Sequence, residues 1–142
     1  NVVVLTGDIH SAWASDLTRD PNNPDVGAGG YDAATGQGAV AVEFITTSVS
    51  SPSLMPDPDG TLARLVFSQN PHIKSVDLNH RGYLLLDLTP ARVVGEQWIV
   101  DTVEVPSSGH AFVTAFEVQH GSNHLVPSAQ TAPAPNPPPP AP

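Results

Sequence analysis

Aspartate and histidine stand one residue apart near the start of the sequence, in Gly7-Asp8-Ile9-His10. Asp8 offers a hard oxygen ligand and His10 an imidazole nitrogen. The pair could bind a metal ion, or the Asp could bind the metal while the His contacts a bound anion. The spacing alone favours a structural role, a capping Asp and a hydrogen-bonded loop His, because an apolar run that ends in Gly-Asp is common in α/β turns.

Three other stretches carry polar side chains, and a structural role is favoured for the first two. His72 follows Asn70-Pro71 and could reach a pocket, although a turn His after a helix-stopping Asn-Pro is the favoured interpretation. Residues 79–82 predict a hairpin turn in which Arg81 could pair with Asp77. The hydroxyl residues in 46–51 could line a site, but no His-Asp arrangement is readable that would make one of the serines a nucleophile.

The candidate Asp-His pair directly follows an apolar, β-branched run at residues 2–6. This run predicts a strand buried on both faces, and ligands in open α/β sheets collect beyond the carboxyl ends of such strands. Residues 14–19 predict a second strand or a frayed helix, and residues 61–68 a short helix. Further strands are expected at 39–47, 73–78, 82–89, 93–100 and 111–119. The short turns between residues 73 and 100 predict an antiparallel meander.

The composition excludes several classes of site and partner. The 142 residues carry a formal net charge of −9, with only five Lys and Arg residues, which are scattered. Nucleic-acid binding and docking on anionic membranes therefore lack their main electrostatic attraction. The absence of Cys excludes disulfides and thiolate ligands, so any metal must be bound by His, Asp, Glu, Asn or backbone oxygen. No apolar run approaches the roughly 20 residues that span a bilayer.

Two parts of unequal size are expected along the chain. Residues 1–131 have the composition of about one domain. Residues 132–142 are rich in Pro and Ala and cannot form a core, so they are expected to be a linker or a disordered end. A strand buried on both faces needs neighbours on both sides, which predicts that the chain is the C-terminal part of a larger α/β protein.

Three segments in this order resemble the C-terminal part of the PhoD-like alkaline phosphatases, which belong to the calcineurin-like metallophosphoesterases. The segments are VVVLTGDIHSAWASDL, AVEFITTSVSSPS and NPHIKSVDLNHRGYLLLDLTP, and together they extend over about residues 1 to 100. The resemblance implies an α/β fold: a metallophosphoesterase-type sandwich of two mixed β-sheets flanked by helices, of which this chain is the β-rich C-terminal portion. Residues 1–131 would then be the C-terminal part of a metallophosphatase catalytic domain.

The same resemblance implies metal-dependent hydrolysis of phosphomonoesters, phosphodiesters or both. It assigns Asp8 and His10 as metal ligands, with His10 also a catalytic or substrate-binding residue. Substrate binding by His72 is a further expectation, which rests on the place of this residue before the strand at 73–78. The implied metals are Ca²⁺ and Fe³⁺, with Zn²⁺ or Mn²⁺ as alternatives. Phosphoryl transfer fits such metals, because they neutralise the phosphate oxygens and activate the nucleophile.

The resemblance also implies that the site is completed elsewhere. The family's other ligands, including its Cys and Tyr iron ligands, lie upstream of the strand at residues 2–6, so an N-terminal portion of the same protein is the expected partner. Residues 1–142 alone are expected to be inactive, and the complete protein is expected to be secreted or periplasmic. The alternative is a non-catalytic β-rich binding or structural module whose Pro-rich end is a linker to another domain.

Overall fold

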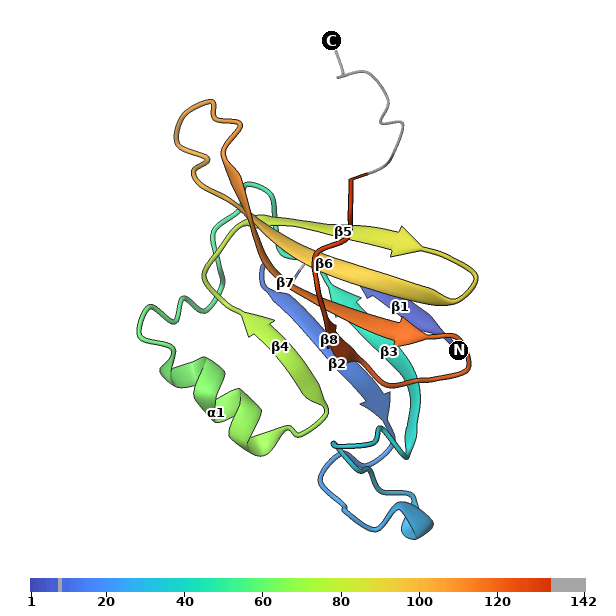
Figure 1. Cartoon of the computed structure of the whole chain (residues 1–142). Helices are drawn as coiled ribbons and strands as arrows, with labels where there is room; N and C mark the ends of the chain where they lie inside the picture. The colour runs from blue at the N-terminus through green and yellow to red at the C-terminus, as the bar shows by residue number, and fades with distance from the viewer. Residues whose placement is uncertain (8, 134–142) are drawn as a thin grey trace.

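The computed structural model describes residues 1–7 and 9–133, which form two stacked β-sheets (Figure 1). The first sheet has the strand order β1-β3-β2-β4, and the second has the order β5-β6-β7-β8. The strands are β1 (Val3–Thr6), β2 (Ala12–Thr18), β3 (Ala39–Ile45), β4 (Ile73–Asp77), β5 (Gly82–Leu88), β6 (Arg92–Val100), β7 (His110–Gln119) and β8 (Val126–Ser128). One α-helix, α1 (Thr61–Gln69), and one 3₁₀ turn, η1 (Val26–Ala28), complete the elements of the described residues.

The prediction of two β-sheets is confirmed, with one difference in their type. The first sheet is mixed, because β1 pairs with β3 in parallel while β2 is antiparallel to both β3 and β4. The second sheet is antiparallel throughout rather than mixed. Helices on both faces are not seen in the described part of the chain, whose single α-helix lies beside β4.

The predicted meander is wrong for its first strand and confirmed for the others. β4 pairs with β2 in the first sheet, whereas β5 begins the second sheet and continues as an antiparallel meander through β6 and β7. The turn between β4 and β5 is a crossover between the layers. Its residue Leu78 is only 3% exposed, whereas the tip of a hairpin would face solvent.

The core lies between the two sheets. Val42 and Phe44 of β3 are fully buried, and they belong to one cluster with Phe116 and Val118 of β7. Gly95 of β6 allows the layers to approach, because a Cβ atom at this position would lie 2.5 Å from the Phe44 ring. The alternating apolar residues of β3 and β7 thus form the inner faces of a sandwich.

Strand β1 lies at the edge of the first sheet and is less buried than its sequence predicts. Val3 and Val4 are half-buried, while Leu5 is 57% exposed. Within the described residues β3 is its only neighbour, so the expected burial on both faces is not provided by this part of the chain. An apolar edge strand of this kind presents unpaired backbone groups to which another strand can pair.

The remaining predictions about elements have mixed outcomes. The strand alternative for residues 14–19 is confirmed, with β2 beginning two residues earlier, and the helix at 61–68 is confirmed with one additional residue. Most of the Pro-rich end predicted at 132–142 lies outside the described residues. No helix among the described residues is both long and apolar enough to cross a membrane.

Candidate functional site

Three strands of the first sheet end at the same edge. β1 and β3 are parallel, and β4 runs in the same direction because both β3 and β4 are antiparallel to β2. The carboxyl ends of these three strands therefore meet where β2 begins, a position at which α/β sheets commonly place ligands. Three segments gather at this edge: residues 7 and 9–11, residues 46–53, and residues 78–81. Each of them belongs to a different one of the three resembling sequence segments.

His10 lies at this edge in an unusual backbone conformation. Its φ angle is 60°, and it is the only non-glycine residue of the described chain with a positive φ. The ring atom Nδ1 lies 3.0 Å from the carbonyl oxygen of Pro52, which can only accept, so the Nδ1–H donates. In the neutral imidazole this donation leaves Nε2 without a proton, free to bind a metal or accept a hydrogen bond. A left-handed conformation at a non-glycine residue is a strain that often marks a functional site.

Asp8, the other half of the candidate pair, lies outside the described residues. Among residues 1–7 and 9–133, no three His, Cys, Asp or Glu side chains gather as a metal site would require. His10 is thus the one member of the predicted pair whose geometry the structure gives. Its assignment as a metal ligand stays a prediction, as does that of Asp8.

The loop that accepts the His10 hydrogen bond is fixed by contacts with the β4–β5 turn. The Thr47 hydroxyl donates to the His80 carbonyl at 3.0 Å, and the backbone N–H of Gly82 donates to the Ser48 carbonyl at 3.0 Å. The guanidinium Nε of Arg81 donates to the carbonyl oxygens of Ser50 and Ser51 at 3.1 and 3.3 Å. Irregular backbone is therefore held by specific polar contacts at this edge rather than by a strand ladder.

The predicted pairing of Arg81 with Asp77 is wrong. The Asp77 carboxylate instead accepts hydrogen bonds from the backbone N–H groups of Asn79 and His80, and lies 2.9 Å from the His80 ring Nδ1. These short-range bonds form an Asx-type turn, which uses the carboxylate locally. Arg81 is left to contact the loop at 50–51.

An open hollow of about 500 Å³ lies between the β1 edge and β5. Its polar lining comes from Thr6, Thr46, Thr47 and Tyr83, and its apolar lining includes Leu5 and Leu84. The hollow therefore adjoins the strand ends that carry the candidate residues. Its mixed lining suits contact with another part of a protein as well as with a ligand.

The structure does not bring His72 to this edge. His72 directly precedes β4, and its carbonyl accepts the backbone N–H of Asp16, near the far end of β2. Four residues of strand, about 13 Å, separate Ala12 at the start of β2 from Asp16. The His72 Nδ1 atom is buried without a partner among the described residues, and burial lowers the pKa of this ring. Substrate binding by His72 stays a prediction, but His72 and His10 do not share one end of the sheet.

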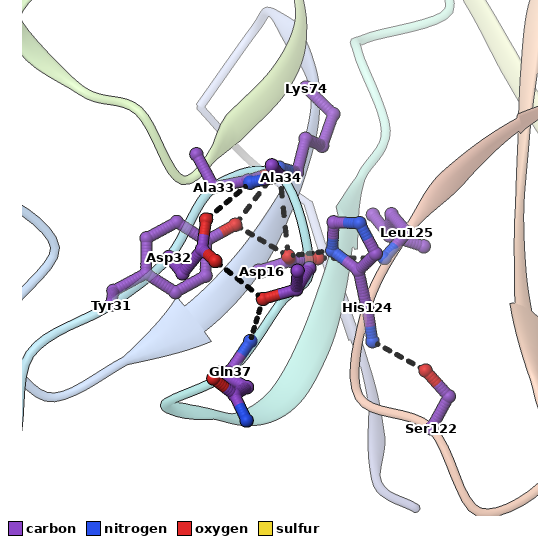
Figure 2. Close-up of polar contacts among 11 residues, drawn as sticks. Asp16, Tyr31, Asp32, Ala33, Ala34, Gln37, Lys74, Ser122, His124 and Leu125 are labelled. Atoms are coloured by element: carbon purple, nitrogen blue, oxygen red, sulfur yellow. Dashed lines mark hydrogen bonds and ion pairs between the residues drawn. The ribbon is translucent and has the colours of Figure 1, made fainter. Parts of the chain in front are cut away.

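A second polar cluster occupies that far end, and the sequence did not reveal it. Asp16 is fully buried, and Figure 2 shows its carboxylate among the side chains of Tyr31, Lys74 and His124. The Tyr31 hydroxyl donates at 2.7 Å, the His124 Nδ1 lies at 2.6 Å, and the Lys74 ammonium lies at 3.7 Å. The backbone N–H of Leu125 donates to the other carboxylate oxygen at 2.8 Å. His124 is thus packed against this buried acid, with its side chain only 17% exposed.

The side chains of the Asp16 cluster satisfy one another's charges and hydrogen bonds. Burial, followed by the hydrogen bond to Asp16, raises the pKa of Tyr31 well above its usual range, so the phenol stays protonated and donates. Lys74 also donates to the Tyr31 oxygen at 2.9 Å and neutralises the acid. An acidic residue inside a strand of small and apolar residues was the signal available in the sequence. The cluster joins β2, β4 and the segment before β8, and its geometry indicates a structural role.

Comparison with known proteins gives a consistent result. A model of the PhoD-like phosphatase family matches residues 1–97. Alkaline phosphatase D of Bacillus subtilis (strain 168) is 32% identical over 125 residues, which is 88% of this chain and 19% of that protein. A solved structure described as the structure of PhoD superposes with a TM-score of 0.70 at 26% identity, over 93% of this chain and 23% of the other. The chain therefore spans about a fifth of the length of these relatives, and it belongs to the PhoD-like phosphatase family.

Proposed function

We propose that this chain contributes one edge of the active site of a phosphoesterase that hydrolyses phosphomonoesters, phosphodiesters or both. The observation that carries the proposal is the convergence at one sheet edge of three sequence segments, with the Nε2 atom of His10 left free to act. The PhoD-like family model supports a phosphatase, because its match over residues 1–97 includes all three segments. The chain spans about a fifth of each relative, which supports a site completed by another portion of the protein, and the family resemblance places that portion N-terminal.

The donors at this edge fit a metal centre only in part. His10 would provide one imidazole nitrogen, which suits iron, zinc or manganese better than calcium. Asp8, the adjacent acid of the sequence, would provide the carboxylate oxygen that Ca²⁺ prefers. A centre of Ca²⁺ and Fe³⁺, with Zn²⁺ or Mn²⁺ as alternatives, would need further ligands from the N-terminal portion. Such a centre, when bound, neutralises the phosphate oxygens and activates the nucleophile.

The protein's own contribution at this edge follows from the orientation of His10. The Pro52 carbonyl holds the proton of this residue on Nδ1, so Nε2 faces away from the loop as an acceptor or ligand. If Nε2 takes up a proton, His10 can donate it to the leaving oxygen of the ester as a general acid. Both roles use the same ring orientation.

The surface around this edge supports an N-terminal portion packed against it. The exposed Leu5 of β1 and the hollow beside β5 present apolar surface that a separate soluble domain rarely leaves uncovered. Helices that flank the sandwich would come from that portion. Export of the complete protein stays a prediction of the family resemblance.

The test is hydrolysis of a chromogenic phosphomonoester and a phosphodiester by the complete protein, with His10→Ala, Asp8→Asn and metal removal by a chelator. Loss of general acid or ligand function predicts a decrease in kcat of about 10²- to 10⁴-fold for His10→Ala. The matched control is His120→Ala, because His120 is exposed in the turn that follows β7. Full activity of both His10→Ala and Asp8→Asn would contradict the proposal. A parallel His72→Ala variant tests the separate prediction for that residue.

A further inference from the structure

Arg81 is linked to His10 through a short piece of loop. Its Nε donates to the carbonyls of Ser50 and Ser51, and the next carbonyl along the chain, that of Pro52, accepts the proton of His10. The acceptors of the guanidinium and of the imidazole are therefore adjacent in sequence. A displacement of the loop at 50–51 would move the carbonyl that orients His10.

The backbone of Arg81 is anchored on the second sheet. Its carbonyl accepts the N–H of Val100 at 3.0 Å, and the following residue, Gly82, begins β5. A Cβ atom at Gly82 would lie 1.9 Å from the carbonyl oxygen of Trp98, so this turn packs against β6 with no room for a side chain. Arg81 therefore connects a rigid sheet to an irregular loop.

Apart from the hydrogen bond of Thr47 to the His80 carbonyl, the loop has few other constraints. The Ser48 hydroxyl donates to the Ser51 carbonyl at 2.6 Å, and Gly82 N–H donates to the Ser48 carbonyl. Residues 46–53 form no strand or helix, so no backbone ladder fixes the Pro52 carbonyl. A charged donor shared between two carbonyls is a stronger restraint than a neutral one, and the planar guanidinium fixes its direction.

We propose that Arg81 is a positioning residue of the active site, which braces the loop at 50–52 and thereby fixes the orientation of the His10 ring. This inference rests on the proposed phosphoesterase function, since the orientation of His10 matters only if Nε2 takes part in the reaction. Groups that orient an acting His commonly change activity by roughly 10- to 100-fold when they are removed.

The kinetic test is a double-mutant cycle on the complete protein with a chromogenic phosphomonoester. Arg81→Ala is expected to lower kcat by roughly 10- to 100-fold with little change in KM, and Arg81→Lys to recover part of that loss. In a His10→Ala background, Arg81→Ala should change kcat by less than about twofold, because the oriented group is gone. Independent, multiplying effects of the two substitutions would overturn the inference. Arg92→Ala removes the same charge at the opposite end of β6, where Arg92 pairs with Glu117, and serves as the control.

A structural test does not depend on activity. In a crystal structure of Arg81→Ala, the Pro52 carbonyl should lie farther from the His10 Nδ1 atom than the 3.0 Å of the unmutated protein, with β5 to β7 in place. An unchanged position of the Pro52 carbonyl and the His10 ring would overturn the inference even if activity falls. Inactivity of the unmutated complete protein would refute the proposed function instead, and the crystal structure would still decide whether Arg81 braces the loop.

Discussion

The two ends of strand β2 hold histidine–aspartate pairs in contrasting surroundings. At the far end, His124 Nδ1 lies 2.6 Å from Asp16, and the two side chains are 17% and 0% exposed. At the edge where β2 begins, His80 Nδ1 lies 2.9 Å from Asp77, and the exposed fractions are 55% and 17%. The far pair is surrounded by Tyr31 and Lys74, whereas the near pair belongs to a turn beside solvent.

The difference indicates that the Asp16 end of β2 serves the stability of the fold and that the end beside His10 serves its function. A fully buried carboxylate with its partners in place holds distant segments together, and its removal leaves charges without compensation. The edge where β2 begins is instead irregular, partly exposed and strained at His10. Regions that bind or react are drawn from such less stable parts of a fold. The comparison predicts large stability effects at one end and activity effects at the other.

The largest expected effect on stability comes from Asp16→Ala. This substitution leaves the buried Tyr31 without its acceptor and Lys74 without its counter-ion, and we expect the free energy of unfolding to fall by about 3–5 kcal/mol. The matched change Asp77→Ala removes the hydrogen bonds of a partly exposed turn and should cost about 1 kcal/mol. Urea unfolding of both variants gives the comparison. Equal losses would mean that the two ends do not differ in the way the structure indicates.

The contrast between the two ends also explains how much could be predicted from sequence. Patterns of β-branched and alternating apolar residues predicted most strands and the helix, because these patterns are local. The position of His10 at a sheet edge was also predictable, since an apolar run ends directly before Gly7. Asp16 was missed because its partners Tyr31 and His124 lie 15 and 108 residues away.

Sheet pairing failed for a similar reason. The separation between 73–77 and 82–88 suits a hairpin, but β4 pairs with β2, some sixty residues earlier in the chain. The Pro52 acceptor of His10 lies 42 residues away, and no local pattern points to it. Long-range pairing was therefore the part of the fold that the sequence could not predict, because tertiary contacts determine it.

Alkaline pH provides a second test of the end of β2 that holds the Asp16 cluster. The raised pKa of Tyr31 stabilises the folded state fully below the usual tyrosine pKa of about 10, and this contribution is lost as pH rises above that value. We expect the free energy of unfolding to fall by up to about 1.4 kcal/mol per pH unit above pH 10 on account of Tyr31. In Tyr31→Phe that contribution to the slope should disappear, whereas Tyr83→Phe should retain it. Urea unfolding at pH 9 to 11 measures both, and an unchanged slope in Tyr31→Phe would contradict the role of the buried phenol.

The smallest expected effect has the opposite sign and lies at the strained end. Neither His10→Gly nor His10→Ala has an imidazole, so their difference in stability reports only the backbone at φ 60°. A Cβ atom in the left-handed region costs about 1 kcal/mol, and His10→Gly should therefore be more stable than His10→Ala by about that amount. At His80, whose φ is not positive, the order should reverse, because glycine costs roughly 0.5–1 kcal/mol in chain entropy. The same order at both positions would show that His10 carries no backbone strain. The opposite orders would show that the backbone is strained at His10 and not at His80, so the edge where β2 begins gives up stability at the residue that carries the candidate imidazole.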